Sequence, residues 1–147
     1  MLVTNHVLSG AVVGRVVRNV PAAFGVAVVS HLVLDAVPHW GGRPLEDVMG
    51  VAVADGLTGL AVMASVALAT EPDRRLSVLA GMSGAAFLDL DKPSSVFFGF
   101  SPFPAGVDAL HARIQRESPR RMPQELLVGL AGALLVAALT RRARGRS

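Results

Sequence analysis

A histidine, an aspartate and a second histidine follow one another at intervals of four residues in the segment His31-Leu-Val-Leu-Asp35-Ala-Val-Pro-His39. On an α-helix, side chains four positions apart lie on the same face, so His31 and Asp35 point in the same direction. Together they can bind one metal ion, and His39, just after Pro38, can supply a third ligand and leave a position for water. A buried, hydrogen-bonded His31–Asp35 pair without a metal is the alternative interpretation.

Two further aspartates, Asp89 and Asp91, directly follow the apolar segment 79–88. Carboxylates this close repel each other unless a cation or a shared proton lies between them. We therefore expect a divalent ion at this position. The alternative is a helix C-terminus in the headgroup region of a bilayer, with Lys92 paired to one of the aspartates.

Asp55 and His111 are candidates for accepting a proton during catalysis. Asp55 is the only charged residue in the core of a long apolar segment, where an unpaired carboxylate is costly and usually faces a functional interior. A protonated Asp55 bonded to a backbone carbonyl is the alternative. His111 shares a helical face with Asp108. The alternative is that His111 is a solvent-exposed polar side chain without a catalytic role.

The composition limits how these residues are positioned and which ligands are available. The chain has 147 residues, of which 52% are hydrophobic and 17% charged, and its mean hydropathy is +0.51. Soluble domains carry more charge, so a membrane setting is favoured. No stretch of span length is free of both charged residues and histidine, which keeps a soluble all-α protein as the alternative. Because cysteine is absent, a metal must bind through His, Asp or Glu.

Hydrophobic patterning and helix breakers predict an all-α protein, a compact single-domain bundle (residues 1–147) of about five helices embedded in a membrane. Thr4 or Asn5 is expected to cap the first helix, and Pro93 to force the chain out of helix after the fourth. A short surface or re-entrant helix is expected over residues 107–116. The five predicted helices cover residues 3–18, 21–37, 45–70, 73–90 and 123–140, followed by a basic tail (141–147) with Arg141, Arg142, Arg144 and Arg146.

The basic residues suggest lipid as a partner. The net charge is +3 and the pI about 11.0, but the arginines cluster beside apolar segments. Anionic headgroups explain that distribution better than nucleic acid, because basic and aromatic residues do not alternate. A signal peptide is not expected, since Arg15 and Arg18 interrupt the first apolar segment. Membrane orientation and homo-oligomerisation stay open.

Three segments together resemble the bacterial inner-membrane metal-dependent hydrolase family, the YdjM-like group, which is itself similar to zinc-dependent phospholipase C. They are Asn5-His6-Val-Leu-Ser-Gly, an SHxxxDxxP-type segment from Ser30 to Pro38, and the PDxDHP-like Leu88-Asp89-Leu-Asp91-Lys92-Pro93. Lys92 stands where the family has a histidine. The resemblance implies that the metal ligands are His6, His31, Asp35, Asp89 and Asp91.

These observations lead to the expectation of a multi-pass inner-membrane enzyme. A divalent ion, Zn²⁺ before Mn²⁺ or Fe²⁺, would activate water to hydrolyse a phosphoester, plausibly of a lipid, with Asp55 or His111 accepting the proton. Two other functions remain open. Intramembrane Asp and His also build ion pathways in transporters, and they can link helices in a non-catalytic membrane scaffold.

Overall fold

The computed structural model describes residues 1–144, and within this range it contains helices and no strand. The expected all-α fold is confirmed. Arg146 of the predicted basic tail lies outside the described residues, whereas Arg141 and Arg142 continue the last helix. The helices are α1 (Val3–Val16), α2 (Val20–Asp35), α3 (Leu45–Ala69), α4 (Pro72–Ala86), the 3-10 helix η1 (Leu88–Leu90), α5 (Asp91–Phe98), α6 (Ala105–Ile114) and α7 (Met122–Arg144).

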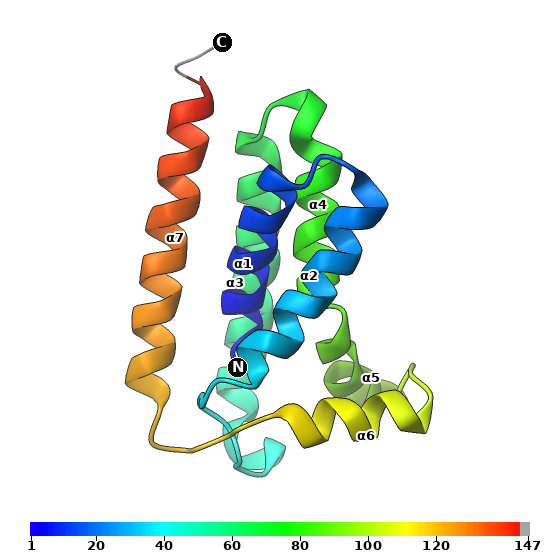
Figure 1. Cartoon of the computed structure of the whole chain (residues 1–147). Helices are drawn as coiled ribbons and strands as arrows, with labels where there is room; N and C mark the ends of the chain where they lie inside the picture. The colour runs from blue at the N-terminus through cyan, green and yellow to red at the C-terminus, as the bar shows by residue number, and fades with distance from the viewer. Residues whose placement is uncertain (145–147) are drawn as a thin grey trace.

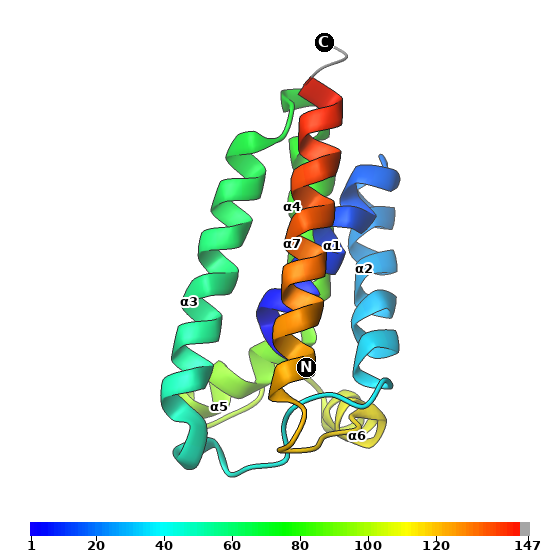
Figure 2. The same ribbon diagram turned by 90° about the vertical axis from the view of Figure 1, so that its left-hand side faces the viewer.

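Helix α1 is the central element, because it contacts α2, α3, α4 and α7 (Figure 1). α6 crosses the lower end of this bundle in Figure 1 and is seen nearly end-on in Figure 2. The apolar core lies between α1, α4 and α7 and excludes water from the middle of the bundle. Its buried side chains are Val7, Leu8, Ala11, Val78, Met82 and Val136.

Glycines let α1 and α4 approach each other closely. A Cβ added at Gly10 would overlap the backbone of Gly81, and one added at Gly81 would overlap the backbone of α1. Interfaces between membrane helices are enriched in such small residues, because close backbone approach maximises van der Waals contact. This contact fixes α1, and with it His6, relative to the C-terminal end of α4.

We expect Gly81→Val to lower the free energy of unfolding by about 1–3 kcal/mol or more, since the valine can fit only if the two helices separate. Gly25→Val is the matched control, because Gly25 has open space around its Cα in the interior of α2. Thermal unfolding followed by circular dichroism in detergent measures both variants. Equal losses in the two would show that the α1–α4 contact is not tight.

The expected caps of the first helix, Thr4 and Asn5, are wrong. Helix α1 begins earlier, at Val3, and Leu2 at its N-cap position offers no side-chain hydrogen bond. Carboxylates from other helices take over this role. Those of Asp55 in α3 and Glu125 in α7 accept backbone N–H bonds from the start of α1.

The expectation that Pro93 forces the chain out of helix is also wrong. The predicted helix 73–90 ends at Ala86, and after η1 the chain re-enters a helix, α5, with Pro93 in its first turn. Proline is tolerated there because the first-turn N–H groups have no intrahelical acceptor. The short helix expected over 107–116 is present as α6.

Helices α3 and α7 are long and apolar enough to span a membrane. At 1.5 Å per residue, the 25-residue α3 is about 37 Å long, more than the roughly 30 Å of a bilayer core. Only 17% of the most apolar stretch of α3 and 11% of that of α7 is buried. Most of their apolar side chains therefore lie on the outer surface of the protein, and few, such as Val136, belong to its core.

Candidate metal centre

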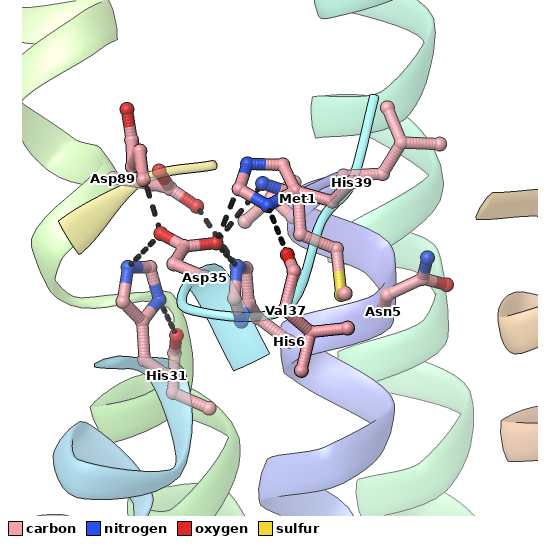
Figure 3. A network of polar contacts seen from close by, with 12 residues as sticks. Met1, Asn5, His6, His31, Asp35, Val37, His39 and Asp89 are labelled. Atoms are coloured by element: carbon pink, nitrogen blue, oxygen red, sulfur yellow. Dashed lines mark hydrogen bonds and ion pairs between the residues drawn. The ribbon is translucent and has the colours of Figure 1, made fainter. Parts of the chain in front are cut away.

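Asp35 lies at the centre of a cluster of imidazoles at the end of the bundle where α2 and α4 finish and α1 begins (Figure 3). It is the last residue of α2, and its side chain is 0% exposed. One carboxylate oxygen, Oδ2, lies 3.2 Å from Nε2 of His31 and 3.2 Å from Nε2 of His111. These two nitrogens are 2.9 Å apart, so three ligand atoms meet at one point.

The other oxygen of Asp35, Oδ1, faces a second set of nitrogens. His6 Nε2 lies 3.1 Å away and His39 Nε2 3.9 Å away, and the α-amino group of Met1 lies at 3.0 Å. Asp89 Oδ2 approaches the same His6 nitrogen at 4.0 Å. The two oxygens of one carboxylate thus separate the four histidines into two pairs.

Backbone carbonyls orient two of the imidazoles. His31 Nδ1 lies 2.7 Å from the carbonyl oxygen of Ala85, and His39 Nδ1 lies 2.9 Å from that of Val37. A carbonyl oxygen only accepts, so each Nδ1 carries the proton and the Nε2 lone pair is directed elsewhere in the neutral ring. A second nitrogen held in this way is usual for metal-binding histidines, because it fixes both tautomer and ring orientation.

Several buried polar atoms at this centre have no hydrogen-bond partner. Buried polar atoms are nearly always paired, so a concentration of unpaired ones is typical of a binding site. Within residues 1–144, four of the six such side-chain atoms belong to the centre, namely His6 Nδ1, His39 Nε2, Asp89 Oδ2 and Asp91 Oδ1. All four are nitrogen or carboxylate-oxygen donors of the kind that divalent ions bind.

The spacing of these atoms fits coordination of an ion. Ligands about 2.0–2.2 Å from one ion are separated from each other by roughly 3 Å. The 2.9 and 3.2 Å separations among His31, Asp35 and His111 match this value. A second group, His6 with His31 and Asp89, also has ligand atoms within 4.8 Å of one another. The buried His and Asp side chains could therefore hold a metal ion.

His111 lies between the carboxylates of Asp35 and Asp91. Burial alone lowers the pKa of His111, but the carboxylates of Asp35 and Asp91 outweigh it and raise the pKa to about 9. Asp91 Oδ2 lies 3.6 Å from Nδ1, on the opposite side of the ring from Asp35. A site that favours the imidazolium also attracts an external cation.

Lys92 compensates part of this negative charge. Its Nζ donates to Asp89 Oδ1 at 2.9 Å and lies 3.6 Å from Asp91 Oδ1. Although burial by itself raises the pKa of Asp89, Lys92 and the nearby histidines hold it below its ordinary value. The pairing of Lys92 with an aspartate, one of the two sequence-based interpretations, is therefore present beside the candidate ligands.

The proposed proton acceptors are placed differently from each other. Both oxygens of Asp55 accept backbone N–H bonds of α1, from Val3 at 2.6 Å and Thr4 at 3.2 Å. Asp55 thus stabilises the positive end of the α1 dipole, and it is not among the side chains around Asp35. His111 does join that cluster, but with the nitrogen that faces His31 and Asp35, which is the position of a ligand.

Sequence reasoning missed two residues of this region. Gln115 Nε2 lies 3.1 Å from His111 Nε2 and 3.4 Å from Asp35 Oδ2, and a half-turn of the amide would present its oxygen there instead. Glu125, 1% exposed, accepts bonds from the backbone N–H groups of Leu2 and Trp40 and from the Asn5 side chain. An acid in the first turn of an apolar helix looks like ordinary helix-dipole compensation, so no signal in the sequence indicated this role for Glu125.

No family model, curated protein or solved structure matches this chain. The resemblance of its short segments to the YdjM-like family stays a prediction. The function of the protein is therefore inferred from the geometry around Asp35.

Proposed function

We propose that this chain is a multi-pass membrane enzyme that binds two divalent ions, zinc by preference, and hydrolyses a phosphoester with metal-activated water. The observation that supports it is the meeting of four imidazole Nε2 atoms at the two oxygens of the buried Asp35 carboxylate. An isolated salt bridge needs one imidazole. Four directed at one carboxylate are better explained by cations that bind between them.

Each oxygen of Asp35 serves one ion in this proposal. His31 and His111 complete the first ligand set, and Gln115 is available to it through its amide oxygen. His6, His39 and Asp89 would complete the second, because His31, which also lies near His6 and Asp89, is already a ligand of the first. Asp35 would contribute to both ligand sets, because an imidazole nitrogen can bind only one ion whereas a carboxylate can bind two. Paired ions lower the pKa of a coordinated water and neutralise charge that develops on a phosphoryl oxygen.

Two charged side chains beside the ligands act on the substrate. Asp91 Oδ1 has no hydrogen-bond partner and accepts the proton of the attacking water, in place of Asp55 and His111. Lys92, whose side chain is 44% exposed, attracts and orients the phosphate. Lys92→Ala is therefore expected to raise KM and leave the bound metal unchanged.

The membrane assignment is supported by the surface of α3 and α7. Leucines that are more than half exposed extend along both helices, among them Leu57 and Leu60 in α3 and Leu130 and Leu134 in α7. Such a surface is costly in water and favourable in lipid. Only helices whose backbone groups are satisfied internally can occupy this environment, and both helices meet that condition.

Elemental analysis of the detergent-purified protein tests the proposal. We expect about two zinc ions per chain in the wild type, and about one in His111→Ala because only the first ligand set is damaged. Asp73→Ala is the matched control, since this aspartate is 74% exposed and should keep both ions. A folded wild type that stays metal-free in excess zinc would overturn the proposal.

Hydrolysis of bis(p-nitrophenyl) phosphate by the same preparations tests the reaction. Activity should disappear on chelation and return with zinc. Wild-type protein that binds zinc but hydrolyses no phosphoester, either soluble or presented in vesicles, would refute the enzymatic part and leave a metal-binding membrane protein.

A further inference from the structure

We propose that α5, α6 and the turn between them lie in the headgroup region of a phospholipid bilayer, anchored there by Phe97, Phe98 and Phe100. The proposal rests on the membrane-spanning role proposed above for α3 and α7. It identifies the surface of the protein through which phospholipid would reach the metal centre.

The three phenylalanines form an exposed apolar patch, in which the ring centroids of Phe98 and Phe100 are 6.3 Å apart. Phe97 is 74% exposed, Phe98 72% and Phe100 61%. The other three phenylalanines pack between elements of the bundle: Phe24 of α2 and Phe103, just before α6, both contact Phe87, just after α4. Clustered, exposed aromatic rings at one end of a bundle are typical of an interaction surface.

The turn that presents this patch is well defined. Gly99 follows α5 with φ of +77°, a left-handed conformation that favours glycine and that reverses the chain between Phe98 and Phe100. Ser94 Oγ donates to the carbonyl oxygen of Phe100 at 2.8 Å and holds the turn against α5. The rings are thus carried on a turn that is hydrogen-bonded to α5, and we call this turn (residues 98–100) the elbow.

The position of the elbow agrees with a bilayer boundary. α5 and α6 lie at the end of the bundle where α3 and α7 begin, and α6 runs across the bundle axis (Figures 1 and 2). If α3 and α7 cross the bilayer, a helix perpendicular to them at their ends lies in the plane of the interface. Amphipathic interfacial helices insert their apolar side chains about 5–10 Å into this region.

Charge complementarity supports a phospholipid as the occupant. Basic side chains are concentrated on α6 and on the link to α7, where they can pair with lipid phosphates. All of them are exposed, and they are Arg113, Arg116, Arg120 and Arg121.

The elbow is directly connected to the metal centre. Asp91 opens α5 and approaches His111 of α6. Phe98, seven residues further along α5, lies only about 10 Å along the helix axis from Asp91. An elbow inserted at the interface therefore brings lipid headgroup phosphates to the level of the proposed ligands.

The absence of cysteine from the chain allows an unambiguous test. Phe98→Cys and Phe100→Cys, each spin-labelled and reconstituted in vesicles of phosphatidylcholine and phosphatidylglycerol, are compared with Leu60→Cys in α3 and Glu117→Cys in the exposed link after α6. Power-saturation EPR with oxygen and a water-soluble nickel chelate measures the depth of each label. We expect the labels at 98 and 100 to lie below the lipid phosphates, the label of Leu60→Cys deeper, and the label of Glu117→Cys on the aqueous side of the phosphates.

Labels at 98 and 100 that are as accessible to nickel as the label at 117, with the label at 60 in lipid, would overturn the inference and leave the spanning helices intact. A label at 60 that is itself in water would refute the membrane assignment as a whole. If a cysteine variant fails to fold, Phe97→Trp in a Trp40→Phe background provides a single tryptophan at the patch. Quenching of its fluorescence by brominated lipid then measures its depth in the bilayer, and an absence of quenching would contradict the inference.

Discussion

Asp35→Asn is expected to remove both bound ions and to lower phosphoester hydrolysis about 10³-fold, a loss of roughly 4 kcal/mol in transition-state stabilisation. Asparagine preserves the size of the side chain, but it carries no charge and turns an NH₂ group toward one pair of imidazoles. Because the two oxygens of Asp35 face the two ligand sets, its loss affects both. Elemental analysis and initial rates measure the two effects.

Asp73→Asn is the control for this substitution, since it makes the same chemical change on an exposed side chain. His111→Ala is the second comparison, because it should lose only one ion. If Asp35→Asn were to lose one ion and keep the other at wild-type affinity, Asp35 would not bridge, and the two-ion arrangement would be wrong. Helical content by circular dichroism shows that a loss of metal is not a loss of fold.

The local part of this centre could be predicted from sequence because it depends on helix periodicity alone. His31 and Asp35 are one turn apart on α2, and the structure places both side chains at one point. Asp89 and Asp91 were expected to need a positive charge, and Lys92 lies beside both. In each case the relevant neighbours are within four residues.

The position of His111 beside Asp35 could not be predicted from helix periodicity. His111 is 76 residues from Asp35, and backbone pairing between two links brings them together. His39 N–H donates to the carbonyl oxygen of Arg116, and Ser118 N–H donates to that of His39, which aligns the ends of α2 and α6. Links of irregular structure leave no periodic pattern in the sequence, so the approach of α6 was not foreseeable.

Asp55 and Asp35 illustrate why the depth of an acid in an apolar helix does not reveal its role. Both are aspartates in apolar helices, and both were expected at the site. Asp55 meets the unpaired N–H groups at the start of α1, whereas Asp35 meets imidazoles. The cost of burying the charge is offset in both cases, by a helix terminus in one and by cationic or metal-binding groups in the other. Only the tertiary arrangement distinguishes them.

Glu125→Gln should weaken the metal centre without altering any proposed ligand. The Glu125 carboxylate accepts one backbone N–H from the start of α1, at Leu2, and one from the link after His39, at Trp40, so it fixes the segments that carry His6 and His39. A glutamine amide can accept at one end only, which leaves a buried donor unpaired. We expect the free energy of unfolding to fall by about 1.5–3 kcal/mol, and zinc affinity to fall about 10–100-fold. Unfolding in mixed micelles and competition with a chelator measure these changes.

The control is Glu46→Gln, because Glu46 also occupies the first turn of a span-length helix but is exposed. Both variants lose one charge near a helix N-terminus, so their difference isolates the hydrogen bonds that Glu125 makes across the bundle. Zinc affinity should fall at the site formed by His6 and His39 and stay unchanged at the site formed by His31 and His111. We therefore expect two distinct zinc dissociation constants in the variant and a single one in the wild type. An equal loss at both ions would mean that Glu125 acts through overall stability rather than by positioning these two histidines.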